Sequence, residues 1–495
     1  MNSPHSTSAV YQRPATARPV NRAAAIYPWV IGLSLLASLW SILIDPLAGA
    51  SQVGPLLQAR LMLEQGLASA TIDPGQALPA LLLAGIHQLS GLPLLEAGLL
   101  VNSVLYALLC LAFVSCCKQL GGGSRVLWFA VAVILLLPQL NLYRSTISAD
   151  AGFWALVLMS LQQLLAYNRR PVLSHQLGWL ACICTAGLLQ PMILLLAVLA
   201  PLSLLHTLPR RQRWGGFLRL ELPAVASTWA LIAWTPAGSS LLEASYQAPA
   251  WLWVSLSQSM PALMATQASI ATGGAVIALA LWQGLRGLGA AYALILVVGS
   301  WRGWTHNIPQ PARWIITCYL LICLLCLVWT GLSQQHTPLQ QTLLPTLLAL
   351  LFVPFILNRL WLAESWHWSA RAAVVLLLVL VISDGLKNTH HRQQGLGQAA
   401  QWLRENTPLQ ARVLSNSPPL AWLSERPVNW RQMPPAAELE LASADWDYLV
   451  MSSEHTPLMQ WYPLAQHPGL TVREVFHAAD GKLVVIFAKL PAAAP

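Results

Sequence analysis

The sequence predicts an all-α polytopic membrane bundle of about eleven transmembrane helices, with surface helices in its first extracytoplasmic loop and a small C-terminal α/β extracytoplasmic domain. Three observations lead to this fold class. Of the 495 residues, 56% are hydrophobic and only 9% are charged, which excludes a soluble globule. Apolar runs of roughly 20 residues recur along most of the chain. From Asp384 onward the composition becomes that of a soluble domain.

The composition divides the chain into three parts. Residues 1–25 are basic and rich in Pro, Ser and Ala, which is typical of a disordered cytoplasmic tail. Residues 26–383 form the transmembrane domain, and its first extracytoplasmic loop covers residues 45–92. Residues 384–495 form the small extracytoplasmic domain.

The first apolar run, 27–44, has no small-residue cleavage site and opens with aromatic residues, so we interpret it as a retained span rather than a signal peptide. The run 175–206 has basic loops at both ends, so it must cross twice, with a turn at Gln190–Pro191. Further spans are predicted at 93–116, 125–140, 148–167, 217–235, 269–299, 312–332, 340–357 and 370–383.

The formal net charge of +9 could indicate either a nucleic-acid partner or an anionic surface. The positions of the basic residues along the chain distinguish these explanations from a role in membrane topology. In the transmembrane domain they fall in alternate loops, as the positive-inside rule requires, so nucleic acid is excluded as a partner. We therefore predict a multi-pass protein of the bacterial inner membrane with a cytoplasmic N-terminus and a periplasmic C-terminal domain. The basic groups are Arg13/Arg18/Arg22, Lys118/Arg125, Arg169/Arg170, Arg210/Arg211/Arg213/Arg219, Arg302/Arg313 and Arg359/Arg371.

The eight cysteines lie in or beside apolar runs and show no metal-ligand spacing, so packed or lipid-facing thiols explain them. The sequence thus predicts no metal site, although a divalent metal stays open as a cofactor. There is also no phosphate-binding glycine motif, which leaves nucleotide-sugar chemistry without support.

A short amphipathic helix follows the first span and is too short to cross a bilayer, so it is expected to lie on the membrane surface. Its apolar positions are Val53, Leu56, Leu57, Leu61 and Leu63.

In the soluble part, Ala399, Ala400, Trp402 and Leu403 mark one face of a helix. Strands are predicted at 412–415 and 448–451, followed by a hairpin that turns at Asp480–Gly481. A helix followed by short strands indicates a small α/β domain.

The first loop and the span after it contain four motifs in a fixed order. They are a helix motif with Ala59, Arg60, Leu63 and Gly66, a Pro-rich segment at Asp73–Pro79, an apolar run at Leu81–Gly91, and the close of the next span at Leu120–Gly122. The C-terminal part contains the segments AQWLRENTP and DYLV. Both ends of the chain thereby resemble the GT-C superfamily of lipid-phosphosugar-dependent glycosyltransferases, which includes protein mannosyltransferases and aminoarabinose transferases.

The resemblance implies an integral-membrane glycosyltransferase that acts on the extracytoplasmic face. Such an enzyme moves a hexosyl or pentosyl group, with inversion, from a polyprenyl-phosphate-linked donor to an envelope glycan, lipid or protein acceptor. Membrane lipid is then a further partner.

Two positions depart from the family pattern. The family's Asp-Glu pair falls on Ser51 and Gln52, and Gln341 stands where an Arg reaches the donor phosphate. A degenerate, non-catalytic member with a binding or scaffold role therefore remains an alternative. A lipid-linked glycan flippase or transporter is a third class, which predicts inverted repeats that the sequence does not show.

The transfer needs a base for the acceptor hydroxyl. Asp150 is the first candidate for this base, because it opens the predicted fourth span, where an ionisable group is costly. Arg144, Ser148 and Asp150 also match the residues that surround an acid at this place in the GT-C enzymes. The alternative is that Asp150 is only a helix-terminal acid, which the helix macrodipole favours. Asp45 ends the first span and either replaces the missing acid or only terminates that span.

The leaving phosphate needs cationic or polar partners. Arg144 and Arg60 are the predicted outer-face cations, and each could bind this phosphate. Phosphates of lipid headgroups are equally suitable partners for them. Gln341 offers neutral hydrogen bonds, and the nearby His336 is either protonated beside the phosphate or merely solvated.

Overall fold

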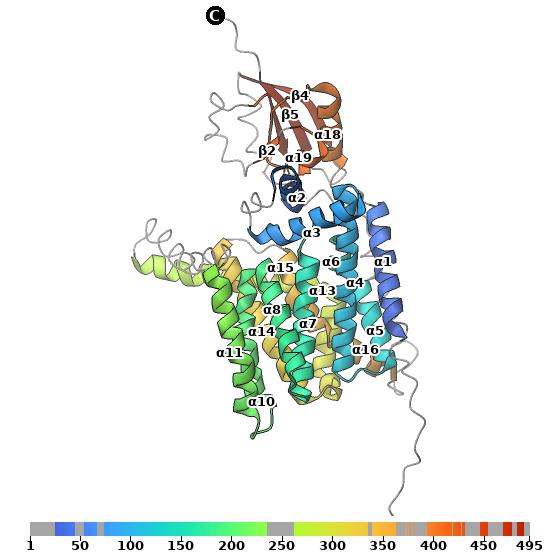
Figure 1. Ribbon diagram of the computed structural model, residues 1–495, viewed down its shortest axis with the longest axis vertical. Helices are drawn as coiled ribbons and strands as arrows, with labels where there is room; N and C mark the ends of the chain where they lie inside the picture. Colours follow the sequence, from blue (N-terminus) through green and yellow to red (C-terminus); the bar gives the residue numbers. More distant parts are fainter. Residues whose placement is uncertain are drawn as a thin grey trace, which may run out of the picture.

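The chain folds into a helical body with a small sheet beyond one end of it (Figure 1). The structure is a computed structural model. It describes residues 25–44, 54–66, 74–234, 262–334 and 339–362, single positions within 372–379, and 394–417, 419–426, 428–430, 446–453, 469–477 and 483–489.

The helical body is built around α4 (Leu94–Gln119) and α7 (Asp150–Arg169), both of which are buried along most of their length. They contact each other, and α1 (Ile26–Ile44) packs against α4. The other helices of the body are α5 (Ser124–Leu135), α6 (Pro138–Leu142), α8 (Leu173–Leu189), α9 (Leu194–Leu199), α10 (Leu204–Thr207), α11 (Arg213–Trp234), α13 (Ala262–Trp301), α14 (Gln310–Gln334), α15 (Leu339–Leu350) and α16 (Val353–Leu362).

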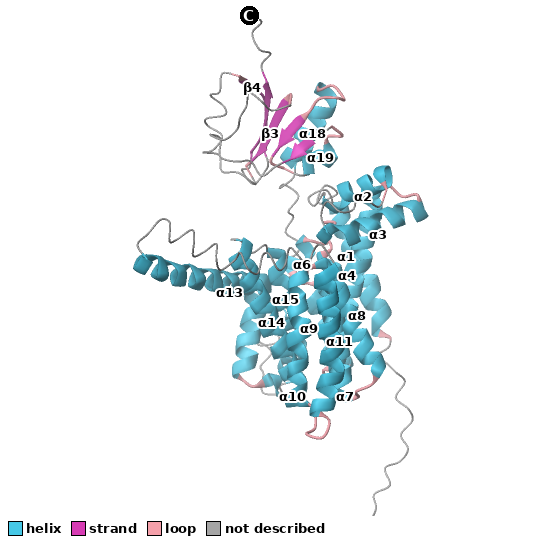
Figure 2. Cartoon of the chain, turned by 60° about the vertical axis from the view of Figure 1, so that its left-hand side comes forward, coloured by secondary structure: helices cyan, strands magenta, loops and turns pink. Residues whose placement is uncertain are grey.

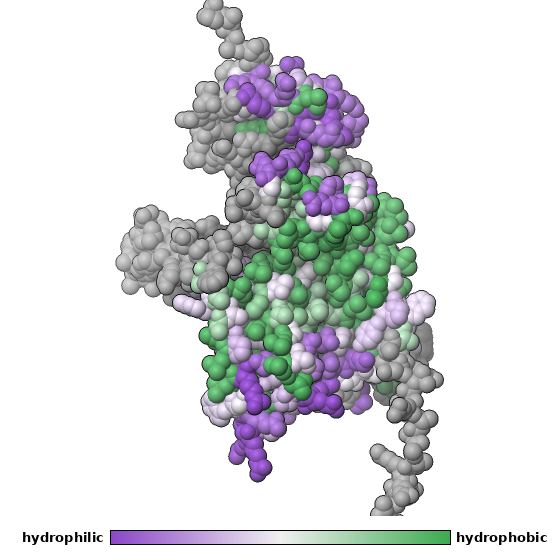
Figure 3. All heavy atoms as spheres, in the orientation of Figure 1, coloured by the Kyte–Doolittle hydropathy of each residue, from purple (hydrophilic) through white to green (hydrophobic). Residues whose placement is uncertain are grey.

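Several of these helices are suited to a bilayer. Among the described residues, four segments are long and apolar enough to cross a membrane, and one bent pair would be a fifth. Figure 3 shows a hydrophobic band across the visible face of the body, with hydrophilic residues toward both of its ends. We conclude that this is a multi-pass membrane protein, while the count of about eleven spans stays a prediction. The four segments are Ile26–Ile44, Leu94–Gln119, Gln310–Thr330 and Thr342–Leu362.

The predicted reversal at Gln190–Pro191 is confirmed, because α8 ends at Leu189 and a 3-10 turn, η3 (Pro191–Ile193), starts the return. The predicted span 125–140 stops early, at Leu135, since Pro138 begins a separate short helix. The predicted span 370–383 lies almost wholly outside the described residues.

The predicted span 269–299 falls on a helix that is sharply bent. Its helix α13 bends by 71° between Ile277–Gly284 and Arg286–Trp301. Gly289 has a φ of 73°, a left-handed value that glycine adopts at little cost. Figure 2 shows the first half of α13 running outward at the level of α6, at the end of the body that faces the sheet.

The first loop holds two helices, α2 (Gly54–Gln65) and α3 (Pro74–Ser90), which pack on each other and against α4. The predicted helix is confirmed. Of its predicted apolar positions, Leu56 is buried within the protein, and Leu57, Leu61 and Leu63 are partly buried. Ala59 and Met62 are also buried. These buried side chains belong to the hydrophobic cluster that α2 forms with α3.

The C-terminal part forms a five-stranded sheet in the order β2-β1-β3-β5-β4. Its elements are α18 (Gln394–Asn406), β1 (Val413–Ser415), α19 (Pro419–Leu423), β2 (Val428–Trp430), β3 (Tyr448–Ser452), β4 (Leu470–His477) and β5 (Leu483–Lys489). The predicted helix and the strands at 412–415 and 448–451 are confirmed. The predicted turn at residues 480–481 lies outside the described residues, and the division of the chain into three parts stays a prediction.

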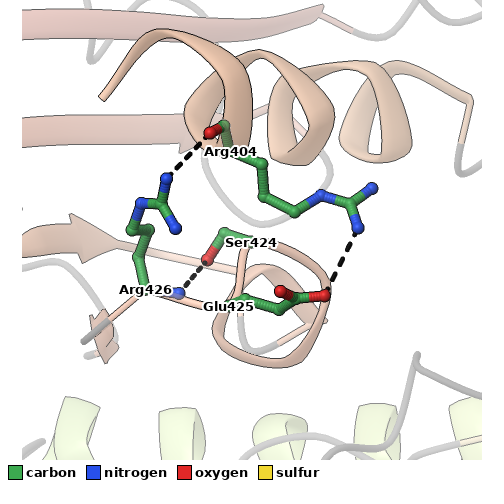
Figure 4. Close-up of polar contacts among 4 residues, drawn as sticks. All are labelled: Arg404, Ser424, Glu425 and Arg426. Atoms are coloured by element: carbon green, nitrogen blue, oxygen red, sulfur yellow. Dashed lines mark hydrogen bonds and ion pairs between the residues drawn. The ribbon is translucent and has the colours of Figure 1, made fainter. Parts of the chain in front are cut away.

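Arg426 holds α19 and the end of α18 together. Its Nη2 donates to the carbonyl oxygen of Arg404 at 2.8 Å (Figure 4). It also donates to the carbonyl oxygen of Thr407 at 2.9 Å, and so caps α18. Glu425, with a φ of 54°, pairs with Arg404 at 3.4 Å. This turn fixes Trp422 of α19, which packs against the hydrophobic cluster of α2 and α3.

Candidate functional site

Asp150 is the first residue of α7, and its side chain is half-buried. Its backbone N–H donates to Ser148 Oγ at 3.3 Å, which fixes the start of the helix. A carboxylate in the first turn of a helix is stabilised by the macrodipole. The acid therefore has a defined place at the start of α7.

A second polar side chain reaches Asp150 from the neighbouring helix. Gln190 directly follows α8, and its Nε2 donates to Asp150 Oδ1 at 3.4 Å. The contact brings the start of α7 and the end of α8 together. The amide contacts Oδ1, and no side chain among the described residues donates to Oδ2, which can therefore accept from an incoming hydroxyl group.

A cavity of about 170 Å³ lies beside this acid, between α2, α3, α4, α7 and α8. Most of its walls are aliphatic, and Ser148, Ala149 and Gly152 line it next to Asp150 in the chain. A smaller cavity of about 40 Å³ is lined by Phe153 and Gln190. Asp150 is thus flanked along the chain by residues of both cavities. An apolar cavity next to a carboxylate suits a ligand with a hydrocarbon chain and a polar end.

Arg144 was expected at the outer face, and the structure places its guanidinium inside the bundle. The residue is 1% exposed, and its Nη2 donates to Cys110 Sγ at 3.7 Å. Along α4, Cys110 lies about 24 Å from the first residue of the helix at 1.5 Å per residue. The side chain points away from the membrane surface, so it is not presented to an outer-face phosphate in this structure.

Arg60, the other predicted cation, lies on the exposed side of α2. Its Nε pairs with Glu64 at 2.8 Å, and the two side chains are 60% and 54% exposed. An exposed pair of this kind contributes little to stability, so the guanidinium is available at small cost.

Three further predicted residues have little or no described structure. Asp45 and His336 lie outside the described residues, as do Ser51 and Gln52. Gln341 belongs to the first turn of α15.

Sequence reasoning missed an exposed cation, Arg286, as a candidate site residue. It lies at the bend of α13 and is exposed. A Cβ added to Gly287 would lie 2.9 Å from Thr346 Oγ1 of α15, so the bend touches α15 within two turns of Gln341. The glycines at 284, 287 and 289 were the available signal, because such a cluster favours a break over a straight span.

The described residues contain no group of three His, Cys, Asp or Glu side chains that could hold a metal ion. Asp150 alone does not make such a site.

The fold is similar to that of two crystal structures of ArnT from Cupriavidus metallidurans. The apo state superposes with a TM-score of 0.52 and the state bound to undecaprenyl phosphate with a TM-score of 0.50. Both are 13% identical, and each match covers 94% of this chain and 98% of that chain. The oligosaccharyltransferase of Archaeoglobus fulgidus in the apo form matches with a TM-score of 0.46 and 12% identity, covering 86% of this chain and 70% of that chain.

The two ArnT structures confirm the predicted resemblance at the level of the fold. At 13% identity the likeness to ArnT shows the fold alone. No protein-family model matches this chain, and no curated protein sequence matches it.

Proposed function

We propose that this protein is a membrane glycosyltransferase that moves a sugar from a polyprenyl-phosphate-linked donor to an envelope glycan, lipid or protein on the extracytoplasmic face. The observation that carries the proposal is the position of Asp150 beside the apolar cavity. The cavity would take part of the polyprenyl chain, and the acid would face the sugar-phosphate end of the donor.

In this proposal Asp150 is the general base. It accepts the proton of the acceptor hydroxyl as that oxygen attacks the anomeric carbon, and the lipid phosphate leaves from the opposite face. The neighbouring Gln190 orients one carboxylate oxygen and leaves the other for the acceptor. Asp45, which directly follows the last residue of α1, is the second candidate for the base.

The leaving phosphate needs positive charge to stabilise it. Arg286 at the bend of α13 and Arg60 on α2 are both exposed and could supply that charge. A charge-assisted hydrogen bond is roughly twice as strong as a neutral one, so Arg286 would offset the missing charge at Gln341. His336 is a further candidate from the same part of the sequence.

The main alternative is a non-catalytic protein that binds the donor lipid, because the family's acid pair falls on Ser51 and Gln52. A flippase is the other alternative. Both could use the cavity, but neither needs a base at Asp150, so the role of this acid separates the three functions.

The experiment uses membranes that contain the full-length protein and polyprenyl phosphate carrying a radiolabelled sugar. Label is followed into the lipid, glycan and protein fractions for the native protein, for Asp150→Asn, and for Ser203→Ala, which removes a buried hydroxyl elsewhere in the bundle. We expect transfer by the native protein and by Ser203→Ala and none by Asp150→Asn at equal protein levels. Donor binding without any transfer by the native protein would instead support the non-catalytic role.

A further inference from the structure

The outer half of α1 is attached to the bundle in an unusual way. The buried residues of α1 recur at every fourth position and are Ile26, Val30, Ser34 and Ser38. The first two make apolar contacts, but the outer two are serines, and no residue of α1 after Ser38 is buried. Apolar packing therefore holds only the inner half of this helix.

The serines of the outer half are held by Arg144. Its Nη1 donates to Ser34 Oγ at 3.1 Å, to Ser38 Oγ at 3.2 Å and to the Ser34 carbonyl oxygen at 3.2 Å. All three residues are almost completely buried. One guanidinium group thus replaces the hydrophobic contacts that the outer half of α1 lacks.

The same arginine is fixed on its other side by α4. Its carbonyl oxygen accepts a hydrogen bond of 2.8 Å from Asn102, and its guanidinium lies 5.1 Å from the centre of the Tyr106 ring. Nη2 reaches Cys110, so the three α4 partners also recur at every fourth position. Nε donates to Asn141 Oδ1 at 2.8 Å, which fixes the turn after α6.

No carboxylate lies within ion-pair distance of Arg144 among the described residues. A cation without a counter-ion in a membrane bundle is costly and is expected to have a functional reason. The planar fork of an arginine can bond to several acceptors at once, which a lysine cannot reproduce.

Arg144 belongs to the segment that carries the candidate base. The short segment after Arg144 leads to Asp150 at the start of α7, and the guanidinium ties this segment to α1 and α4. Ser38 is the last buried residue of α1, so the contacts of Arg144 with Ser34 and Ser38, here called the clamp, lie in the outer half of that helix.

We propose that Arg144 is a positioning residue that fixes the segment leading into α7 against the outer half of α1 and against α4, and thereby sets the place of Asp150. The inference rests on the proposed function, in which this acid faces the reacting groups. A displacement of reacting groups by about 1 Å can cost roughly 100-fold in rate, so loss of the clamp should act on catalysis rather than on donor binding.

The test compares the double variant Ser34→Ala/Ser38→Ala and the variant Arg144→Met with the matched control Ser203→Ala. The methionine variant removes the buried charge together with the clamp, so it remains informative if the double variant folds poorly. For both clamp variants we expect kcat to fall by about 100-fold, while KM for the polyprenyl-phosphate sugar changes by less than about twofold. Ser203→Ala should match the native protein.

A distance measurement keeps this inference separate from the proposed function. Spin labels are attached through a ketone-bearing amino acid at Leu43, an exposed residue near the end of α1, and at Glu96, an exposed residue near the start of α4. The native protein should give a narrow distance distribution and the clamp variants a broad one, even if no transfer is detected. An unchanged distribution would overturn the clamp. A rise in KM with kcat unchanged, or unchanged kcat despite a broadened distribution, would overturn the positioning role.

Discussion

The side-chain amide of Gln190 donates a hydrogen bond of 3.4 Å to the carboxylate of Asp150, and this contact joins the end of α8 to the start of α7. Pro191 follows directly and starts the 3-10 turn. The residues that reverse the chain therefore also place the Gln190 amide beside the Asp150 carboxylate. Asp150 is thus oriented by a neighbouring helix as well as by its own.

If this amide orients the acid, Gln190→Leu should lower the rate of sugar transfer by about tenfold. Hydrogen bonds to charged groups contribute about 1.5–3 kcal/mol, and this one is at the long end of the accepted distances. The matched control is Gln163→Leu, because Gln163 Oε1 contacts His175 Nδ1 at 2.9 Å and joins the same two helices at their other end. Equal losses in both variants would assign only a structural role to Gln190.

The role of the cavity is tested by two neighbouring leucines of α3. Leu82 lines the cavity and Leu81 does not, although their side chains are 47% and 46% exposed. We expect Leu82→Gln to weaken binding of undecaprenyl phosphate by about tenfold, since burial of a leucine side chain contributes roughly 1.5–3 kcal/mol. Leu81→Gln should bind as the native protein does. Native mass spectrometry of the purified protein measures both affinities, and equal affinities would place the lipid chain elsewhere.

Trp422 is expected to couple the C-terminal sheet to the first loop. The ring packs against the α2 and α3 cluster, so Trp422→Ala should make the backbone amides of α2 exchange hydrogen about tenfold faster and leave those of the sheet unchanged. Trp402→Ala is the contrasting variant, because Trp402 packs within the C-terminal core and against Tyr448. It should accelerate exchange in the sheet, and the same pattern for both variants would contradict a specific contact at Trp422.

Topology is a separate prediction, which rests on the positions of the basic residues. A reporter fused after Ala494 should behave as extracytoplasmic, and one fused at Asn168 should behave as cytoplasmic. Paired phosphatase and fluorescent-protein fusions measure this directly. The reverse pair of signals would invert the whole arrangement and move Asp150 to the cytoplasmic face.

Local patterns predicted the elements that depend on local chemistry. Apolar length predicted α4, and the Gln190–Pro191 reversal followed from basic residues at both ends of one apolar run. A short apolar run in the soluble part predicted the strand at Tyr448. Proline and glycine then divided several spans in ways that a hydropathy count overlooks. The bend of α13 is the main case, because Gly289 adopts a left-handed conformation inside an otherwise apolar run.

Tertiary contacts decided what the sequence could not. The sequence predicts Arg144 as an outer-face cation, but its side chain lies inside the bundle, where it donates hydrogen bonds to Ser34 and Ser38. Those serines lie far away in the chain and look like ordinary small residues of a span. Similarly, the buried face of α2 is selected by its contact with α3, which no periodicity in α2 reveals.

The central claim is that Asp150 supports sugar transfer, and release of free polyprenyl phosphate from a polyprenyl-phosphate sugar tests it most directly, because every acceptor yields this product. Purified full-length protein is mixed with the donor lipid and an envelope extract, and the released phosphate lipid is measured by mass spectrometry. We predict multiple turnovers for the native protein and, for Asp150→Asn, a rate lower by at least about 100-fold, since a general base contributes typically 10²–10⁴-fold. Equal release by the two proteins, or no release by the native protein despite bound donor, would contradict the claim.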